Sequence, residues 1–127
     1  MGTDITACVE YLDEGDYELF ATVFMGCSYF LFARMAGVRN AKGVEPVSEL
    51  RGFPMDAAWS TYVLREEEGG HSDSYLSADE FEKALHLAMY DADPDYEPGA
   101  VLPPTFAATL AMLKALPSAR LVFWFDC

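Results

Sequence analysis

The chain has 127 residues and carries 21 acidic side chains against 8 basic ones, which gives a net charge of −13 at pH 7. Hydrophobic residues make up 52% of the chain and aromatic residues 14%, unlike the aromatic-poor composition of acidic disordered segments. We therefore expect a single folded domain over residues 1–127, with an acidic surface that repels nucleic acid and attracts basic partners.

The first half of the chain predicts two strands, a short helix and a long loop. β-forming residues fill 4–12 and 17–25 on either side of a glycine-containing turn, a pattern typical of a hairpin. Ser28 can cap a helix that Gly37 terminates. Residues 38–55 hold two glycines and two prolines, and we expect an ordered loop of the kind that often carries function.

A second helix is expected after this loop. Asp56 is a good N-cap for it, and a pair of glycines ends it near Glu67. Trp59, Tyr62 and Val63 give this helix an apolar face at helical spacing. The polar residues that follow the glycine pair are typical of a turn.

The last third of the chain predicts two more helices. Ser77 and Glu80 form a capping box at the start of the first one. Its expected buried stripe consists of Phe81, Ala84, Leu85, Ala88 and Met89. Residues 91–104 predict a second long loop, after which Pro104 can begin a helix that ends before Pro117.

Residues 120–125 are strongly β-forming and predict a final strand. The simplest sheet joins this strand to the N-terminal hairpin. The expected fold is therefore α+β, with a small, mainly antiparallel sheet and three to four helices packed on it.

The cysteines and the N-terminus bear on location. Cys8, Cys27 and Cys127 are odd in number and form no CxxC motif, so we expect buried or terminal thiols and no disulfide scaffold. Since no basic segment precedes an apolar run at the N-terminus, we expect no signal peptide and a cytoplasmic protein. Residues 19–33 carry no charge, but small residues interrupt them, which favours a buried strand followed by a buried helix over a membrane span.

The acidic residues gather in clusters, and we expect three of these to bind a partner. The clusters are Asp13, Glu14 and Asp16, then Glu66, Glu67 and Glu68, then Asp91, Asp93 and Asp95. Three glutamates at a helix C-terminus oppose the macrodipole, so either that helix ends early or the charge serves a partner. A solvated face is the alternative for any one cluster. The third cluster lacks the glycine and the bidentate glutamate of a calcium loop, so we expect no metal site.

Two arginines in the long loop suggest a second kind of site. Arginine forks suit carboxylates or phosphates, so Arg39 and Arg51 are expected to form an internal clamp on Asp4 or Asp126. The open alternative is a pocket for a small anion, formed by Arg39, Arg51, His71 and Ser72. Nucleophilic catalysis is not expected, because no strand–turn–helix nucleophile motif accompanies the histidine.

Five segments, taken in order, resemble a family of small, uncharacterised phage-encoded proteins over nearly the whole chain. The segments are Gly2–Ile5 with Glu10 and Tyr11, Phe32–Asn40, Arg51–Pro54, His71–Ser74 and Leu121–Asp126. The family often has a histidine where this chain has Thr6, and an asparagine where it has Cys127. The resemblance implies a phage origin. In size and acidity the chain is similar to anti-CRISPR proteins that act as DNA mimics.

Together, these expectations describe a non-enzymatic counter-defence inhibitor that acts in the cytoplasm of the infected host. Its acidic surface would mimic DNA and block a basic nucleic-acid-binding groove of a bacterial CRISPR surveillance complex. The alternatives are a pocket protein that sequesters or hydrolyses a small phosphorylated immune signal, and a minor phage structural protein. We expect no cofactor and no membrane partner. Direct nucleic-acid binding is not expected either, because no basic patch with interleaved aromatics occurs.

Overall fold

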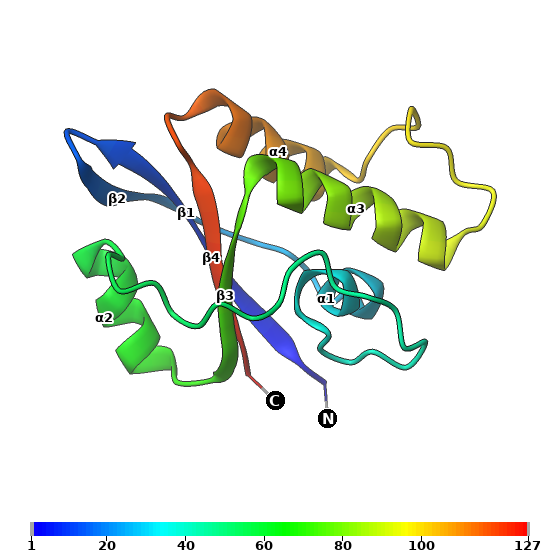
Figure 1. Ribbon diagram of the computed structural model, residues 1–127, viewed down its shortest axis with the longest axis horizontal. Helices are drawn as coiled ribbons and strands as arrows, with labels where there is room; N and C mark the ends of the chain where they lie inside the picture. The colour runs from blue at the N-terminus through cyan, green and yellow to red at the C-terminus, as the bar shows by residue number, and fades with distance from the viewer. Residues whose placement is uncertain (1, 127) are drawn as a thin grey trace.

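The computed structural model describes residues 2–126 and folds them around a four-stranded antiparallel sheet (Figure 1). The elements are β1 (Asp4–Asp13), β2 (Asp16–Val23), α1 (Tyr29–Ala36), α2 (Trp59–Glu68), β3 (His71–Ser77), α3 (Ala78–Ala92), α4 (Pro104–Ala115) and β4 (Arg120–Asp126). The strand order is β2-β1-β4-β3, so the final strand pairs with the N-terminal hairpin as predicted. The predicted α+β class is confirmed, with four helices.

Local signals place several element ends where the sequence predicts them. The Ser28 hydroxyl accepts a hydrogen bond from the Leu31 amide at the start of α1. Gly37 ends that helix in the left-handed conformation, with φ 71°, which glycine adopts without strain. Ser77 and Glu80 form both hydrogen bonds of a capping box at α3.

Strand β3 occupies a polar segment for which the sequence predicted a turn. It pairs antiparallel with β4, whose residues are buried from Arg120 to Phe125. The pairing is irregular between His71 and Ser74, and Ser72 takes a φ of 57°, as in a β-bulge. The segment becomes a strand because its backbone forms hydrogen bonds with the apolar strand β4. Such tertiary context overrides weak β-propensity.

The two faces of the sheet are covered differently. Helices α1, α3 and α4 lie on one side and α2 on the other (Figure 1). The three-helix face buries a large apolar core that includes Phe32, Phe81 and Phe123. The α2 face buries a smaller cluster around Cys8, Val122 and Trp124.

Helix α2 is capped from β1, and the prediction that Asp56 is its N-cap is wrong. The Ala58 amide donates to Oε2 of Glu10 at 2.9 Å, while Oε1 of Glu10 accepts from Nε of Arg120 at 2.8 Å. Asp56 instead binds Nη1 of Arg120 at 3.0 Å. A buried carboxylate on a strand therefore accepts a hydrogen bond from the backbone amide of Ala58, the residue at the N-cap of α2.

The uncharged run at 19–33 forms the end of β2 and the start of α1, as predicted, but the expectation of a buried strand is wrong, since the residues of β2 alternate between exposed and half-buried. No helix among the described residues is long and apolar enough to cross a membrane. Cys8 is buried, and this burial, together with the nearby Glu10 carboxylate, raises the pKa of its thiol to about 12. Cys27 is exposed, contrary to expectation, and its thiol donates to the Thr3 carbonyl.

Candidate functional site

Most of the few basic side chains are used inside the fold. Within residues 2–126, five of the eight form ion pairs with acidic side chains. The pairs are Arg34–Asp91, Arg51–Glu80, Arg65–Asp73, Lys114–Glu82, Arg120–Glu10 and Arg120–Asp56. Only one of these pairs, Arg34–Asp91, involves a residue of the predicted acidic clusters.

Eight of the nine acidic residues predicted to bind a partner are exposed and take part in none of these pairs. The ninth, Asp91, lies in the last turn of α3 and not in the loop where the sequence placed it. Its carboxylate accepts two hydrogen bonds from Arg34, at 2.7 and 2.9 Å. Asp91 therefore has a structural partner within the chain.

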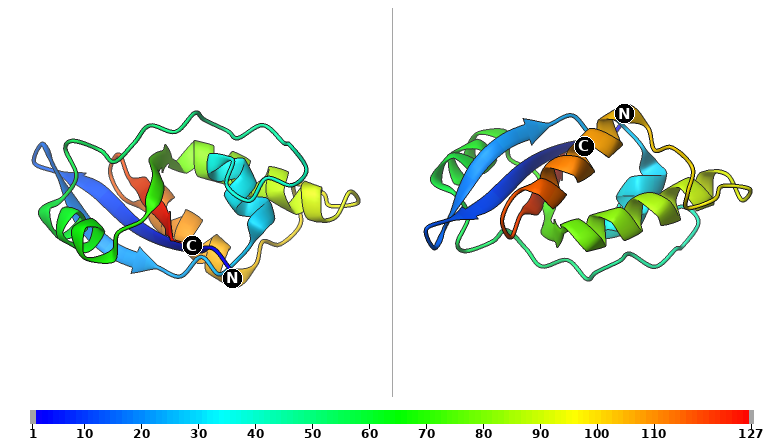
Figure 2. Two further views of the ribbon diagram at one scale, coloured as in Figure 1. Left: turned by 90° about the horizontal axis from the view of Figure 1, so that it is seen from below. Right: turned by 90° about the horizontal axis from the view of Figure 1, so that it is seen from above.

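The three clusters do not share one face. The β1–β2 turn and α2 lie toward one end of the long axis, and the α3–α4 loop with Asp93 and Asp95 projects at the opposite end (Figures 1 and 2). The first two clusters lie toward the first of these ends, and we call their six residues the acidic end. These are Asp13, Glu14, Asp16, Glu66, Glu67 and Glu68. Along the strands the two clusters are separated, because α2 begins beside Glu10 and ends just before His71, which pairs with Phe125 at the far end of β4.

Helix α2 continues through all three of its C-terminal glutamates and ends at Glu68. The one basic residue in its last turn, Arg65, forms two hydrogen bonds with the Asp73 carboxylate and a third with the Gly70 carbonyl. Each exposed glutamate there opposes the helix dipole by roughly 0.3–1 kcal/mol. The helix thus retains an unfavourable local charge, since it does not end early.

The residues predicted to form an anion pocket are not gathered in one cavity. Arg51 donates to both oxygens of Glu80, at 2.8 and 2.6 Å. The expectation that Arg51 clamps Asp4 or Asp126 is therefore wrong. The hydrogen bonding to Arg51 lowers the pKa of Glu80 to about 2. Arg39 and Arg51 border two different cavities.

The other two predicted pocket residues lie at the bulge of β3. His71 Nδ1 is 2.9 Å from the Ser72 hydroxyl, and the His71 ring lies against Phe125. His71 and Ser72 line neither of the two cavities that the arginines border.

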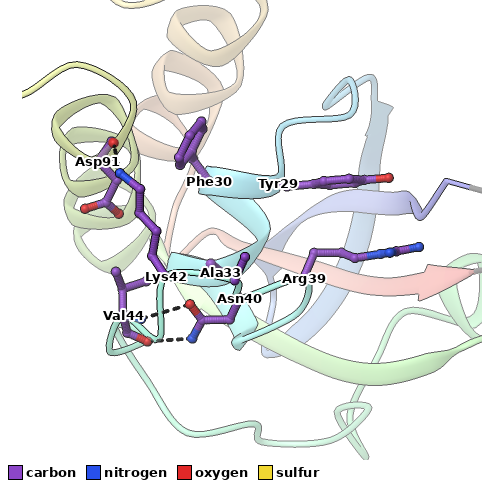
Figure 3. Close-up of a pocket in the computed structure, with 9 residues that line it drawn as sticks. Tyr29, Phe30, Ala33, Arg39, Asn40, Lys42, Val44 and Asp91 are labelled. Atoms are coloured by element: carbon purple, nitrogen blue, oxygen red, sulfur yellow. Dashed lines mark hydrogen bonds between the residues drawn. The ribbon is translucent and has the colours of Figure 1, made fainter.

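The cavity beside Arg39 has a volume of about 240 Å³ and an apolar floor (Figure 3). Tyr29, Phe30 and Ala33 of α1 line it together with Ala41 and Val44 of the following loop. Arg39 lies 5.3 Å from the Tyr29 ring centroid, and its Nε donates to the Thr3 hydroxyl. The arginine is thus held along the cavity wall by contacts within the protein.

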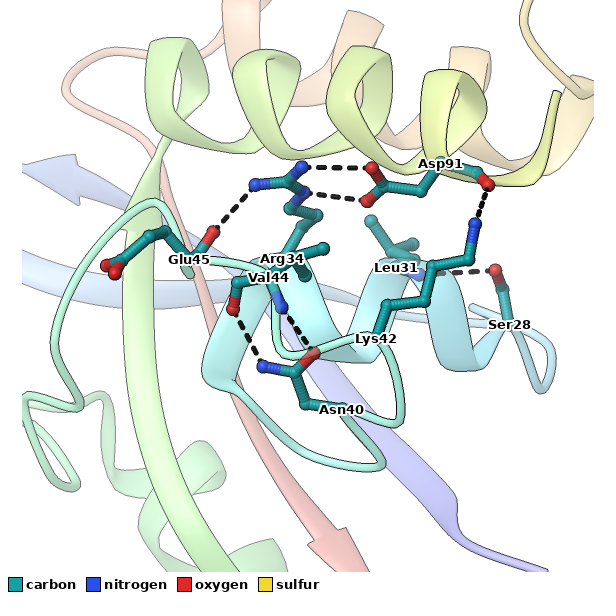
Figure 4. A network of polar contacts seen from close by, with 8 residues as sticks. All are labelled: Ser28, Leu31, Arg34, Asn40, Lys42, Val44, Glu45 and Asp91. Atoms are coloured by element: carbon teal, nitrogen blue, oxygen red, sulfur yellow. Dashed lines mark hydrogen bonds and ion pairs between the residues drawn. The ribbon is translucent and has the colours of Figure 1, made fainter. Parts of the chain in front are cut away.

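Polar contacts hold the first part of the long loop in place (Figure 4). The Asn40 side chain bonds both the amide and the carbonyl of Val44, which closes a tight turn. Arg34 donates to the Glu45 carbonyl, and Lys42 donates to the backbone carbonyl of Asp91 at the end of α3. This part of the loop is therefore ordered, as predicted, because contacts with α1 and α3 and the turn at Asn40 hold it.

Sequence reasoning missed an exposed aromatic surface on α2. The predicted apolar face of Trp59, Tyr62 and Val63 does not lie in the core, since Trp59 is 74% exposed and Tyr62 is also exposed. The helix turns Thr61 toward the sheet instead. The same helical spacing describes a core stripe and a surface patch, so the pattern alone could not separate them.

Metal chemistry finds no support in the described part of the chain, where no three histidine, cysteine, aspartate or glutamate side chains come together to hold an ion. Comparison of the chain with protein-family models, with curated proteins and with solved structures finds no match.

Proposed function

We propose that this protein is a non-enzymatic inhibitor whose acidic end occupies a basic nucleic-acid-binding groove of another protein. The specific target that we propose is a bacterial CRISPR surveillance complex in the cytoplasm of an infected host. This choice of target is supported by the sequence resemblance to phage proteins and by the similarity in size and charge to DNA mimics.

The observation that carries the proposal is the uneven use of charge. In the part of the chain that the structure describes, four of the five arginines form ion pairs with carboxylates within the fold, whereas the six carboxylates of the acidic end are exposed and take part in none of these pairs. A local excess of one charge sign speeds encounter with a partner of opposite sign. A groove that binds DNA phosphates presents such a partner surface.

The far end of the molecule provides a matched control. Asp93 and Asp95 are exposed carboxylates of the same type, but they lie at the opposite end of the long axis (Figure 2). If net charge alone drove binding, neutralising them would weaken it in proportion to the charge removed. If the acidic end binds, their neutralisation has little effect.

The test uses a purified, guide-loaded surveillance complex and a labelled duplex target. The wild-type protein is expected to displace the duplex, and 0.5 M salt is expected to abolish this displacement. Substituting the six acidic-end residues by Asn or Gln should weaken inhibition at least tenfold, while Asp93→Asn with Asp95→Asn should change it less than twofold. Inhibition by the six-residue variant at wild-type strength, with its melting temperature unchanged, would refute the proposal.

The geometry favours this function over the expected alternative of a pocket for a small phosphorylated signal. That alternative requires Arg39, Arg51, His71 and Ser72 around one ligand, whereas Arg51 binds Glu80 and borders a different cavity from Arg39. A nucleotide panel that raised the melting temperature, with the effect lost in Arg39→Ala, would reverse this preference.

A further inference from the structure

A groove beside the start of α2 brings together exposed aromatic and apolar side chains. We call it the α2 groove; it has a volume of about 480 Å³ and is lined by Phe53, Pro54, Met55, Ala57, Trp59 and Tyr62. Met55 is fully exposed and Trp59 is 74% exposed. Large apolar side chains gathered in this way mark interaction sites more often than isolated ones do.

The aromatic side chains of the α2 groove are held in place before any partner binds. Trp59 and Tyr62 stack with ring centroids 5.4 Å apart and an interplanar angle of 24°. Phe53 packs edge-on against the buried Trp124. The Glu10 carboxylate fixes the first turn of the helix through the Ala58 amide. A preformed surface loses little conformational entropy on binding.

The groove continues into an acidic region. A second cavity of about 320 Å³ shares Phe53 and Tyr62 with it and is also lined by Glu66 and Asp73. Arg65 borders this cavity too, but its charge is paired with Asp73. The exposed Glu66 carboxylate therefore makes this second cavity negatively charged. The surface thus changes from apolar beside Met55 and Trp59 to negative beside Glu66.

We propose that the α2 groove binds a segment of the target protein that presents an arginine beside an apolar side chain. The apolar side chain fills the space between Met55 and Trp59, and the guanidinium lies on the aromatic stack with its charge toward Glu66. Arginine is favoured because it stacks on aromatic rings and also binds carboxylates. The inference rests on the proposed function, because the partner is the same basic protein.

Charge argues against the other occupants of such a groove. A nucleic acid or an anionic membrane would be repelled by a chain of net charge −13. A second copy of the chain would bring the same net charge and few uncommitted basic side chains. A basic protein segment matches both the aromatic stack and the carboxylate beside it.

The acidic end and the α2 groove should affect binding kinetics differently. Exposed charges chiefly change the association rate and its salt dependence, whereas buried aromatic anchors chiefly change the dissociation rate. Loss of a hot-spot side chain costs at least about 2 kcal/mol, which corresponds to a factor of about 30. We therefore expect Trp59→Ala to raise the dissociation rate from the surveillance complex about 30-fold, with the association rate changed less than threefold.

The experiment measures association and dissociation of the purified complex on immobilised protein. Phe24→Ala is the control, since Phe24 is 78% exposed but lies outside the groove, and it should leave both rates unchanged. If Trp59→Ala and Tyr62→Ala dissociate at the wild-type rate while the six-residue acidic variant fails to bind, the α2 groove proposal is wrong and the proposed function stands.

A peptide arm tests the groove without the complex. The probe is a six-residue peptide of alternating arginine and leucine, and the comparison peptide has glycine in place of leucine. We expect the first peptide to change the fluorescence of Trp59 and to bind at least tenfold more tightly than the second, with the difference lost in Trp59→Ala. Equal affinity for both peptides would overturn the proposal even if the complex is inhibited.

Discussion

The two faces of the sheet are held by different forces. The three-helix face buries phenylalanines from α1, α3 and the sheet against one another. The α2 face has a small apolar cluster, and beside it the Glu10–Arg120 ion pair is buried together with the cap of α2. Both candidate surfaces, the α2 groove and the glutamates of the acidic end, belong to the second face or its edge.

This difference shows how a small domain can keep stability and interaction surface apart. Apolar burial on one face is non-directional and contributes most of the free energy of folding. On the other face, the Glu10 carboxylate forms a hydrogen bond that positions α2, and the aromatic side chains of α2 remain exposed to solvent. Trp59 and Tyr62 can therefore remain exposed because the core does not need them.

The largest effect is expected on the three-helix face. Phe81→Ala should lower the free energy of unfolding by about 3–5 kcal/mol, because Phe81 is fully buried and its removal leaves a cavity. Chemical denaturation monitored by circular dichroism measures the change. Phe24→Ala should cost less than about 0.5 kcal/mol, and equal costs for the two variants would contradict the assignment of the core.

A smaller loss is expected when the ion pair of the α2 face is broken. Glu10→Gln removes the charge that faces Arg120 and should cost about 2–3 kcal/mol, since the only carboxylate that Arg120 then keeps among the described residues is the partly solvated Asp56. Asp56→Asn should cost less than about 1 kcal/mol, because that side chain is 69% exposed. Denaturation of both variants in parallel is the measurement. A Glu10→Gln cost no greater than that of Asp56→Asn would show that the pair does not hold the face.

The α2 face should also open at a lower free energy than the whole protein, because little apolar surface secures it. Cys8 lies beneath this face and reports on opening, since burial raises its thiol pKa to about 12 and suppresses its reaction in the closed state. Thiol exchange in a Cys27→Ser, Cys127→Ser background should give an opening free energy at least about 1 kcal/mol below global stability. An opening free energy equal to global stability would mean that the two faces unfold together.

The smallest effect concerns the Arg51–Glu80 pair, which ties the long loop to α3. The hydrogen bond from Arg51 lowers the folded-state pKa of Glu80 to about 2 from an ordinary value of 4.5. A lowered folded pKa means that the pair stabilises the protein above pH 4.5 and that this contribution is lost as the pH falls through 2. Glu80→Gln, which preserves the capping hydrogen bonds, should cost less than about 1 kcal/mol at pH 7. Its difference from wild type should vanish near pH 2, and a constant difference would contradict the pair.

The parts of the fold that were predictable from sequence depend on signals a few residues apart. Ser28, Gly37 and the Ser77–Glu80 capping box each act on their own helix, and the structure confirms them. Strand β3 was missed because its polar residues pair with β4, more than forty residues away in sequence. The start of α2 was misplaced because its cap comes from Glu10, which is 48 residues distant from Ala58.

The candidate site was predictable to a lesser degree. Composition indicated exposed acidic clusters, and eight of the nine chosen residues are exposed. Which clusters lie together depends on the tertiary fold, and so does the pairing of Asp91 with Arg34. The exposure of Trp59 depends on which face of α2 meets the sheet, a choice that Thr61 and the Glu10 cap decide.

The central position of β4 has a consequence for how the protein is made. β4 lies between β1 and β3, and it is the last of the four strands to be synthesised. Until it leaves the ribosome, β1 lacks one neighbour and β3 lacks its partner, so the nascent chain cannot close its sheet. The buried aromatic residues of β4 then complete both pairings in one late step. We expect folding to follow synthesis, and a nascent chain stalled before Arg120 should remain sensitive to protease.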